Sequence, residues 1–311
     1  MKGKVLVTAF VHPHLCNELR QMGYEIDVNE LISYEELLNV IEDYTGIIIS
    51  TRLRIDSAQF DQATQLKWLA RLGSGMEIVD VTYAAQKGIQ CFSSPEGNCD
   101  AVAEWCLGTL IALRRNLFQA AAQVKNLQWI REPNRGPELQ GKTIGIIGYG
   151  HTGSAFARLL GSFGVKVLAH DKYKTGFGSG HVLESDCEAI AANADVVSLH
   201  LPLGAETHHY VDDAFFQRLR QKPFLLNSSR GSVVDAAALR KALDSGMIAG
   251  AGIDVLENES LATYTAEEWV QLNGLSHRPN VIITPHIAGY SQESLFKMAD
   301  TLIRKLKAAG Y

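Results

Sequence analysis

The chain has 311 residues, of which 46% are hydrophobic and 20% are charged, and its formal net charge at pH 7 is −5. This length and composition are typical of a globular protein with two domains of ordinary size. Lysine and arginine are scattered through a mildly acidic chain, so the sequence shows no electrostatic signature of nucleic-acid binding.

The sequence also does not indicate a membrane protein. Its longest apolar stretch, Trp105 to Leu113, is too short to span a bilayer. The N-terminal segment MKGKVLVTAFVHPH is typical of a strand, and it lacks the length and the cleavage site of a signal peptide. We therefore expect no membrane partner and a cytoplasmic location.

The cysteines and histidines do not form the pattern of a metal site. There is an odd number of cysteines with no Cys-x-x-Cys pair, and no ligand pattern surrounds the histidine pairs at 12/14 and 208/209. We expect no metal, and we expect the cysteines to behave as small buried hydrophobic residues. They are Cys16, Cys91, Cys99, Cys106 and Cys187.

Apolar, β-branched runs alternate with helical patterns, such as those at 33–43 and 236–246. This alternation predicts an α/β fold with parallel sheets built from right-handed βαβ units. The strands are nearly continuous in Val, Ile and Leu, which is typical of sheets covered on both faces. Strands are expected at 4–10, 45–51, 68–73, 143–148, 165–171, 195–202, 224–229, 249–255 and 280–285.

The alternation is interrupted once. Residues 100–126 are typical of one long helix, and a polar, turn-rich segment then precedes the strand that begins at Thr143. Residues 291–310 form a strongly helical tail that could fold back onto the first domain. We therefore expect two domains, one of residues 1–99 with 290–311 and the other of residues 100–289.

The most specific motif is TIGIIGYGHTGSAFARLLGSFGVKVLAHD. In it, Gly148, Gly150 and Gly153 form Gly-x-Gly-x-x-Gly between a predicted strand and an amphipathic helix. The first glycine permits a tight turn, the second lets the backbone approach a pyrophosphate, and the third packs helix against strand. The helix N-terminus supplies free N–H groups to the phosphates. Asp171 ends the next predicted strand, where a carboxylate would bind the ribose hydroxyls.

This motif predicts a dinucleotide site. A carboxylate at position 171 would repel the 2′-phosphate of NADP, so NAD is the favoured cofactor. Lys172 and Lys174 follow it and could accept that phosphate, so NADP stays open.

Further polar side chains follow three other predicted strands. They are Arg230 in FLLNSSRG, Asp254 and Glu259 in GIDVLENES, and His286 in IITPHIAG. Taken singly, Arg230 could be a surface charge, Glu259 a solvated loop residue and His286 a core ring. We favour a functional interpretation because ligands of open α/β sheets bind at the carboxyl ends of the strands, where all of these residues arrive. Charged residues that are buried there would also need to be paired.

A family resemblance is carried by the ordered set GYGHTG, Asp171, NSSRG, GIDVLENE and TPHIAG. Together these motifs resemble the D-isomer-specific 2-hydroxyacid dehydrogenases, the family that includes D-3-phosphoglycerate dehydrogenase. Upstream, RLGSGMEIVD is similar to the family's glycine loop for the substrate carboxylate, and SSPEGNCDAVAEW to its interdomain crossing. The resemblance covers nearly the whole chain. It implies an NAD-binding Rossmann domain inserted into a flavodoxin-like substrate-binding domain, both with parallel sheets.

By this resemblance the protein is an NAD-dependent oxidoreductase that interconverts a D-2-hydroxy acid and its 2-keto acid, with Arg230, Glu259 and His286 as catalytic residues. His286 would take the hydroxyl proton as C2 of the substrate gives its hydride to the nicotinamide. Glu259 would bond the other ring nitrogen and fix the tautomer. Arg230 offers a planar fork to the substrate carboxylate and carbonyl. Asp254 is placed to orient the nicotinamide amide.

The resemblance also implies a homodimer, formed through the helix after Asp100. It implies that backbone N–H groups at positions 74 and 75 share the substrate carboxylate. The implied substrate-binding residues are Arg52, Ser74, Gly75, Asn98 and Arg230. The implied cofactor-binding residues are Gly148, Tyr149, Gly150, His151, Thr152, Gly153, Asp171, His200, Pro202, Thr207, Ser228, Ser229, Asp254 and Gly289.

Departures from the family pattern concern the substrate more than the reaction. Glu77 and Ile78 stand where the family usually has Asp-Asn, and Ser50 stands where many relatives carry arginine. Ser260 replaces the usual proline, and an unusual segment follows it at 261–280.

The sequence leaves several substrates and functions open. D-3-phosphoglycerate is the leading substrate because Arg52, Arg54 and Lys67 could meet a phosphate, although solvated surface charges explain these residues equally well. Glyoxylate, hydroxypyruvate and simple D-2-hydroxy acids remain. Two rival functions are a non-enzymatic NAD-sensing scaffold similar to co-repressors of this family, and a dehydrogenase of another class that shares the Rossmann half.

Overall fold

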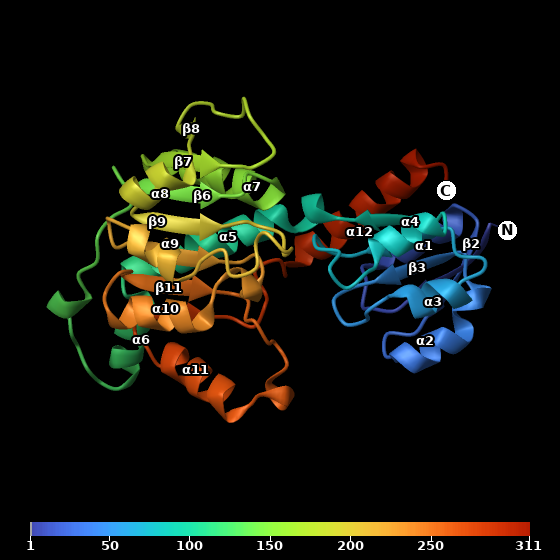
Figure 1. The fold of residues 1–311 in the computed structure, drawn as a ribbon, viewed down its shortest axis with the longest axis horizontal. Helices are drawn as coiled ribbons and strands as arrows, with labels where there is room; N and C mark the ends of the chain where they lie inside the picture. Colours follow the sequence, from blue (N-terminus) through green and yellow to red (C-terminus); the bar gives the residue numbers. More distant parts are fainter. Residues whose placement is uncertain (1) are drawn as a thin grey trace. The chain divides into compact units, whose positions relative to one another are not determined.

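The chain folds around two β-sheets, which are seen in a computed structural model that describes residues 2–311 (Figure 1). It divides into two units. Unit 1 comprises the residues up to Cys99 together with Tyr290–Tyr311, and unit 2 comprises Asp100–Gly289.

Unit 1 is built on a five-stranded parallel sheet with the order β2-β1-β3-β4-β5, which is the strand order of flavodoxin-like sheets. One apolar cluster joins the sheet to α2, α3 and α4, and a second joins it to α1 and α12. The strands are β1 Gly3–Val7, β2 Tyr24–Val28, β3 Gly46–Ile49, β4 Trp68–Arg71 and β5 Gln90–Ser93. The helices are α1 Pro13–Gln21, α2 Tyr34–Val40, η1 Ile41–Asp43, α3 Ser57–Gln62, α4 Val81–Gln86 and α12 Gln292–Ala308.

The C-terminal helix α12 completes unit 1. Met298 and Leu302 are buried in the same cluster as the side chains of α1. Near the end of the helix, Lys305 Nζ donates to the carbonyl oxygen of Ser93 at 2.8 Å and pairs with Glu96 at 2.9 Å. The last helix of the chain is therefore tied to β5 as well as to the core of this unit.

Unit 2 is built on a seven-stranded parallel sheet with the order β12-β11-β10-β9-β6-β7-β8. The strand order reverses between β6 and β9, which makes this pair the switch point where doubly wound sheets bind ligands. The strands are β6 Thr143–Ile147, β7 Lys166–His170, β8 Val182–Glu184, β9 Val196–Leu199, β10 Phe224–Asn227, β11 Gly250–Ile253 and β12 Val281–Ile283.

Helices cover both faces of this sheet. An apolar cluster joins one face to α8, α9, α10 and α11. Ala251 and Ile253 of β11 belong to that cluster, so Gly252 between them faces the other side of the sheet. A Cβ on Gly252 would lie 2.5 Å from Thr109 of α5, so α5 packs closely on this second face. The helices are α5 Pro95–Arg114, α6 Leu117–Lys125, η2 Glu132–Asn134, α7 His151–Leu160, η3 Gly161–Phe163, α8 Cys187–Asn193, α9 Asp213–Arg218, η4 Gly231–Val233, α10 Ala236–Asp244, η5 Leu261–Thr263 and α11 Ala266–Ser276.

The α/β fold with parallel sheets is confirmed, and each of the nine strands expected from the sequence is present. Three strands were not expected: β2, β5 and β8. All three lie at a sheet edge. An edge strand pairs on one side only, so it can be short and need not carry an unbroken apolar run.

The expectation of one helix over 100–126 is wrong. The helix begins earlier, at Pro95, and ends at Arg114, and α6 starts separately at Leu117. Asn116 between them has a left-handed backbone (φ 52°), which asparagine tolerates better than most residues. The returning chain also lies against the helix end, since a Cβ on Gly136 would be 1.8 Å from the carbonyl oxygen of Arg114.

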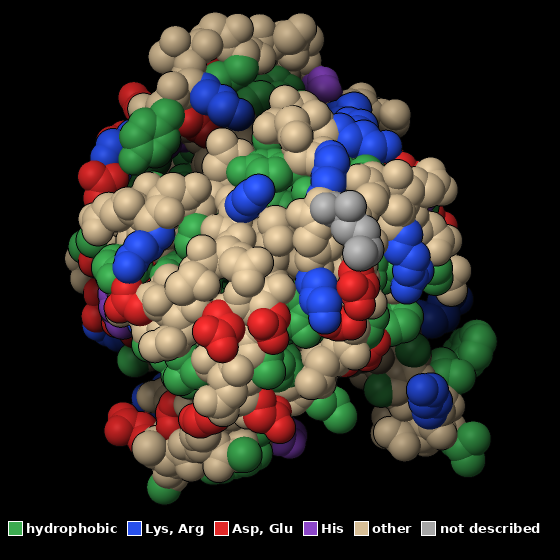
Figure 2. All heavy atoms as spheres, turned by 90° about the vertical axis from the view of Figure 1, so that its right-hand side faces the viewer, with side chains coloured by type: hydrophobic (Ala, Val, Ile, Leu, Met, Phe, Trp, Pro, Cys, Tyr) green, Lys and Arg blue, Asp and Glu red, His purple; other side chains and the backbone are tan. Residues whose placement is uncertain are grey.

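Figure 2 shows charged side chains of both signs on one face of the molecule. On the face shown in Figure 2, Lys and Arg lie scattered among Asp, Glu and hydrophobic side chains. Among residues 2–311, no helix is both long enough and apolar enough to cross a membrane.

Candidate active site

Five strands of unit 2 end at the same level of the sheet. Paired residues of β6, β9, β10, β11 and β12 are in register up to their last positions. Because all of these strands are parallel, the residues that follow them emerge at one edge. These residues are Gly148, His200, Ser228, Asp254 and Thr284.

The three glycines after β6 serve different purposes. Gly148 has φ +95°, and a Cβ there would lie 2.4 Å from the carbonyl oxygen of His200. A Cβ on Gly153 would lie 2.1 Å from the carbonyl oxygen of Gly148, so both positions require glycine for the fold itself. A Cβ on Gly150 would meet nothing within 4 Å. The backbone is therefore open at the position where the motif predicts a pyrophosphate, at the start of α7.

Asp171 lies beside this glycine turn. Its Oδ2 accepts from the backbone N–H of Tyr149 at 2.8 Å, and its Oδ1 accepts from those of Tyr173 and Lys174 at 2.9 and 3.0 Å. A carboxylate offers about four acceptor positions, of which three are used here, so Asp171 can still accept a hydrogen bond from a ribose hydroxyl. The Lys174 ammonium donates to the carbonyl oxygen of Tyr149, and the Lys172 ammonium pairs with Glu206 at 2.5 Å. Both lysines that left NADP open thus have partners within unit 2.

His200 is a buried link between β9 and α7. Its Nε2 lies 2.9 Å from the Ser198 hydroxyl and its Nδ1 lies 3.1 Å from the Thr152 hydroxyl. Burial lowers the pKa of His200 to about 4, so the ring is neutral at physiological pH. Both ring nitrogens and the hydroxyl of Thr152 are therefore already engaged in holding the glycine turn on the sheet.

The remaining predicted cofactor residues lie on the same edge or next to it. Thr207 Oγ1 donates to the carbonyl oxygen of Pro202 at 2.6 Å, which closes the loop after β9. Ser228 Oγ lies 3.4 Å from the Sγ of Cys106, a thiol whose pKa burial raises to about 12. Gly289 ends unit 2, after the turn that carries His286. His151 begins α7 and is exposed, and the ring of Tyr149 stacks on Phe177.

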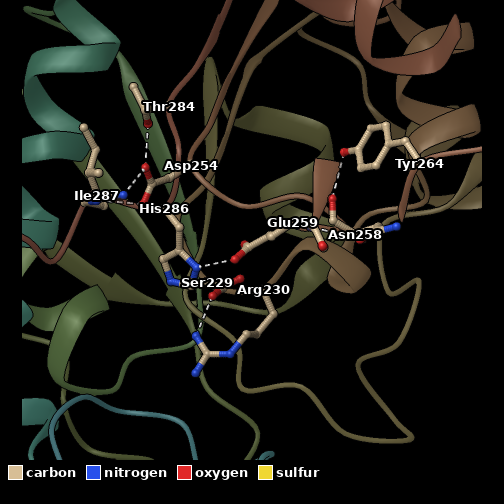
Figure 3. Close-up of polar contacts among 11 residues, drawn as sticks. Ser229, Arg230, Asp254, Asn258, Glu259, Tyr264, Thr284, His286 and Ile287 are labelled. Carbon is tan, nitrogen blue, oxygen red and sulfur yellow. Dashed lines mark hydrogen bonds and ion pairs between the residues drawn. The ribbon is translucent and has the colours of Figure 1, made fainter. Parts of the chain in front are cut away.

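His286 and Glu259 meet, as the sequence predicts. His286 Nδ1 lies 2.8 Å from Glu259 Oε2, so Nε2 is the ring nitrogen that the glutamate does not contact (Figure 3). The two side chains are 38% and 44% exposed, so the pair is accessible to a small ligand. His286 has φ +53°, a left-handed conformation that is strained for a residue other than glycine.

The turn that carries His286 is held by Asp254, which is 1% exposed. Asp254 Oδ1 accepts from the Ile287 N–H at 2.9 Å and the Thr284 hydroxyl at 2.5 Å (Figure 3). Its Oδ2 accepts from the Ala288 N–H at 2.7 Å. Its carbonyl oxygen accepts from the His286 N–H at 2.8 Å. Burial raises the pKa of Asp254, whereas these donors act in the opposite direction.

The contacts of Asp254 extend to α5, since Trp105 Nε1 donates to Thr284 Oγ1 at 3.0 Å. The indole N–H can only donate, so the Thr284 hydroxyl accepts a hydrogen bond from it. The same hydroxyl donates its own hydrogen bond to Asp254. These contacts make Asp254 a residue that positions the histidine, a task that the sequence did not predict.

Arg230 stands in a tightly bonded turn after β10. Its Nη1 donates to the carbonyl oxygen of Ser229 at 2.7 Å, and its own carbonyl oxygen accepts from Asn227 Nδ2 at 3.0 Å. A Cβ on Gly231 would lie 1.9 Å from the carbonyl carbon of Leu256. The loop after β10 is therefore packed against the loop after β11, which carries Glu259.

Unit 1 has its own loop cluster at the carboxyl edge of its sheet. Ser74 Oγ donates to Asn98 Oδ1 at 3.3 Å, so two of the predicted substrate residues are in contact. Arg71, which is 5% exposed, donates through Nε to the carbonyl oxygen of Ser50 at 3.1 Å and through Nη1 to that of Gly75. Arg71 was not predicted from the sequence, although a charged residue in a buried strand is an informative exception.

The three cations expected near a phosphate are not all on this edge. Arg52 Nη2 donates to the carbonyl oxygen of Glu30 at 3.0 Å, and Arg54 lies 3.9 Å from Asp56; both arginines follow β3. Lys67 precedes β4, next to Thr45, and so stands at the amino end of the same parallel pair. The length of β4 separates it from the loops at the carboxyl edge, so the expectation that Lys67 joins the arginines is wrong.

The five cysteines are free thiols, of which Cys16 and Cys106 are buried. Among residues 2–311, no group of three or more His, Cys, Asp or Glu side chains is arranged to hold a metal ion.

Comparison with known proteins gives a family match over most of unit 2. The sequence profile described as "D-isomer specific 2-hydroxyacid dehydrogenase, NAD binding domain" matches residues 107–288. The chain is 34% identical to a glyoxylate reductase of Thermofilum pendens over 89% of its own length and 81% of the relative. It is 32% identical to D-3-phosphoglycerate dehydrogenase of Methanocaldococcus jannaschii over 96% of its own length and 56% of the relative. The chain thus spans little more than half of that phosphoglycerate dehydrogenase.

Solved structures are similar over both units. The TT0316 protein from Thermus thermophilus superimposes with a TM-score of 0.85 at 32% identity, covering 98% of this chain and 96% of that one. D-lactate dehydrogenase from Aquifex aeolicus, solved with NAD and lactic acid, superimposes with a TM-score of 0.85 at 25% identity, covering 98% and 95%.

We predict that Asp254→Asn destabilises the protein. In the asparagine amide only the oxygen can accept a hydrogen bond, so the NH2 group would face the Ala288 N–H. A buried donor would then be unpaired, which lowers the free energy of unfolding by about 1–3 kcal/mol. Urea unfolding measures the loss, and hydrogen exchange at the Ile287 and Ala288 amides should accelerate. As a control, Asp213→Asn removes an exposed ion pair with Lys241 and a negative charge in the first turn of α9, and it should cost less than about 1 kcal/mol. Equal losses in the two variants would contradict the anchoring role of Asp254.

Proposed function

The chain belongs to the D-isomer specific 2-hydroxyacid dehydrogenase family, and on this premise we propose that it interconverts a D-2-hydroxy acid and the corresponding 2-keto acid with NAD. The observation that carries the proposal is the 2.8 Å contact between His286 Nδ1 and Glu259 Oε2, at the same sheet edge as the glycine turn. A proton-transfer pair and a dinucleotide site at one edge are what hydride transfer to or from a hydroxy acid requires.

The cofactor is NAD, which supplies the hydride acceptor or donor at the nicotinamide. We propose that the open backbone at Gly150 and the N-terminus of α7 hold the pyrophosphate. We also propose that Asp171 accepts a hydrogen bond from the ribose. The other cofactor-binding residues expected from the resemblance remain part of this proposal. His200 and Thr152 are engaged with each other, which supports a role in shaping the glycine turn.

His286 moves the proton in the proposed reaction. With Nδ1 bonded to Glu259, its Nε2 would accept the proton of the substrate hydroxyl during oxidation and return it during reduction of the keto acid. Glu259 keeps Nδ1 as the nitrogen that carries a proton throughout, so a single tautomer faces the substrate. The positive charge that forms on the ring during oxidation is balanced by the glutamate.

Substrate binding is assigned to arginine and to backbone groups. Arg230 would bind the carboxylate and carbonyl through two parallel N–H groups. In unit 1 we propose that Ser74, Gly75, Asn98 and Arg52 bind substrate. The contact between Ser74 and Asn98 supports this proposal, and so does the bracing of the glycine loop by Arg71.

The substrate is one of two kinds. The phosphoglycerate dehydrogenase relatives, together with Arg52 and Arg54 at the carboxyl edge of unit 1, support 3-phosphoglycerate. A small acid such as glyoxylate or hydroxypyruvate is supported by the relatives that this chain matches over most of their length, including a hydroxypyruvate reductase of Thermotoga maritima covered over 90%. The place of Lys67 at the other end of the strands removes one of the three cations that favoured a phosphate.

The decisive experiment measures oxidation of NADH and NADPH against 3-phosphohydroxypyruvate, hydroxypyruvate, glyoxylate and pyruvate. We expect turnover with NADH, and the preferred acid identifies the substrate class. For the acids whose reduction product is chiral, oxidation of the D-enantiomer of that product but not of the L-enantiomer would support the assignment. Binding of NADH without turnover of any acid would contradict an enzymatic function and favour an NAD-sensing scaffold.

We predict that His286→Ala lowers kcat by about 10²–10⁴-fold, since it removes the group that carries the substrate proton. The affinity for NADH, measured by quenching of protein fluorescence, should stay near the wild-type value. His277→Ala removes an exposed histidine at the end of α11 and serves as the control. Unchanged turnover in His286→Ala would exclude the histidine from the mechanism.

We also propose a homodimer, formed through the chain segment that follows α5. The apolar side chains of α5 are mostly buried in unit 2, whereas α6 has no buried residue. Between Leu117 and Ile130 the chain exposes several large apolar side chains, including Phe118 (63%), Leu127 (96%) and Trp129 (81%). Such a surface is typical of a subunit interface. Sedimentation equilibrium should give twice the chain mass of 34.1 kDa; the mass of a monomer at micromolar concentration would contradict the proposal.

A further inference from the structure

The residue next to Glu259 is the centre of a local hydrogen-bond network. Asn258 Nδ2 donates to Glu268 Oε1 at 2.9 Å and to Thr263 Oγ1 at 3.1 Å. Its Oδ1 accepts from the Ser260 N–H at 3.0 Å, and its carbonyl oxygen accepts from the Tyr264 hydroxyl at 2.7 Å (Figure 3). Both polar groups of this side chain are thus bonded to residues between Ser260 and Glu268.

These bonds hold the two peptide planes on either side of Glu259. The Tyr264 hydroxyl holds the plane between residues 258 and 259 through the Asn258 carbonyl. The Ser260 N–H, bonded to the Asn258 side chain, holds the plane between residues 259 and 260. Because each peptide group is rigid, fixing both planes fixes the direction in which the Glu259 side chain leaves the backbone.

The network is anchored to the rest of unit 2 through α11. Glu268 Oε2 accepts from the backbone N–H and the hydroxyl of Thr265 at 2.7 and 2.8 Å, which caps the helix. These bonds, led by the backbone N–H of Thr265, lower the pKa of Glu268, so the carboxylate is ionised at neutral pH. Leu275 of the same helix is buried in the apolar cluster of the sheet, and Arg278 pairs with Asp244 of α10.

Glu259 needs such support because its side chain is 44% exposed. An exposed glutamate has several rotatable bonds, and holding it at one position costs conformational entropy. A proline at position 260 would restrict the chain but has no N–H to donate to Asn258. With Ser260 in that position, the same restraint is built from hydrogen bonds.

We propose that Tyr264, Asn258 and Glu268 are positioning residues that hold the Glu259 carboxylate against Nδ1 of His286. This proposal rests on the proposed function for the catalytic role of the pair, while the geometry of the pair can be tested separately. The segment 258–268 then serves the reaction without touching substrate or cofactor.

The test uses Tyr264→Phe, which removes one hydroxyl and leaves the ring in place. Loss of one hydrogen bond of ordinary strength should lower kcat about fivefold. The dissociation constant for NADH should not change. Tyr83→Phe is the matched control, since it removes a hydroxyl bonded to Asp61 at 2.7 Å in unit 1. The same loss of kcat in both variants would overturn the proposal.

A double-mutant cycle separates positioning from general support of the fold. In a Glu259→Ala background there is no carboxylate left to position, so adding Tyr264→Phe should leave the residual rate unchanged. A further fivefold loss in that background would show that Tyr264 acts by another route and would overturn the proposal.

The second readout does not depend on turnover. Nuclear magnetic resonance of ¹⁵N-labelled histidine, assigned with His286→Ala, reports the hydrogen bond at Nδ1 of His286. We expect Tyr264→Phe to move this signal part of the way toward its position in Glu259→Ala. A signal identical to that of the wild type would overturn the positioning role. If the wild-type protein reduces no keto acid, the proposed function fails, and this measurement still decides whether Tyr264 orients Glu259.

Discussion

A buried carboxylate must be given hydrogen-bond donors, and Asp254 takes its donors from the backbone turn that carries His286. Two N–H groups and the hydroxyl of Thr284 converge on its oxygens, and its carbonyl oxygen accepts from the histidine N–H. These bonds offset the strain of the left-handed backbone at position 286. The ring can therefore face Glu259, which arrives from the neighbouring loop.

The glycine turn predicted to bind a dinucleotide lies at the same edge of the sheet as this pair. Gly148 and Gly153 allow backbone atoms to approach so closely that any side chain would collide, and Gly150 leaves its backbone open. His200 links the turn to β9 through its contacts with Thr152 and Ser198. Burial keeps the ring neutral, so one ring nitrogen can donate a hydrogen bond and the other can accept one. Both halves of the candidate site are thus held by buried polar groups with satisfied partners, which favours one fixed arrangement.

Much of the fold and the candidate site could be predicted from the sequence. Interior strands of a parallel sheet are covered on both faces, so they appear as unbroken apolar runs. The glycine spacing and the polar residues after strand ends are local patterns whose geometry follows from the parallel arrangement. The contact between Glu259 and His286 could be expected because both follow strands that end at one edge.

The tertiary structure alone decided features whose cause lies far away in the chain. Edge strands such as β8 are defined by a single neighbour, and the chain returns at Gly136 against the helix end before Asn116. The distance of Lys67 from the arginines follows from its place at the other end of β4. The hydrogen bonds of Asp254 come from Thr284, Ile287 and Ala288, about thirty residues further along the chain, and no local pattern reveals them. The sequence by itself determined the helices and strands and the sheet edge that the polar residues share, because periodicity and composition act locally. Packing decided the partner of each polar group, because a hydrogen bond depends on the positions of its two groups in space.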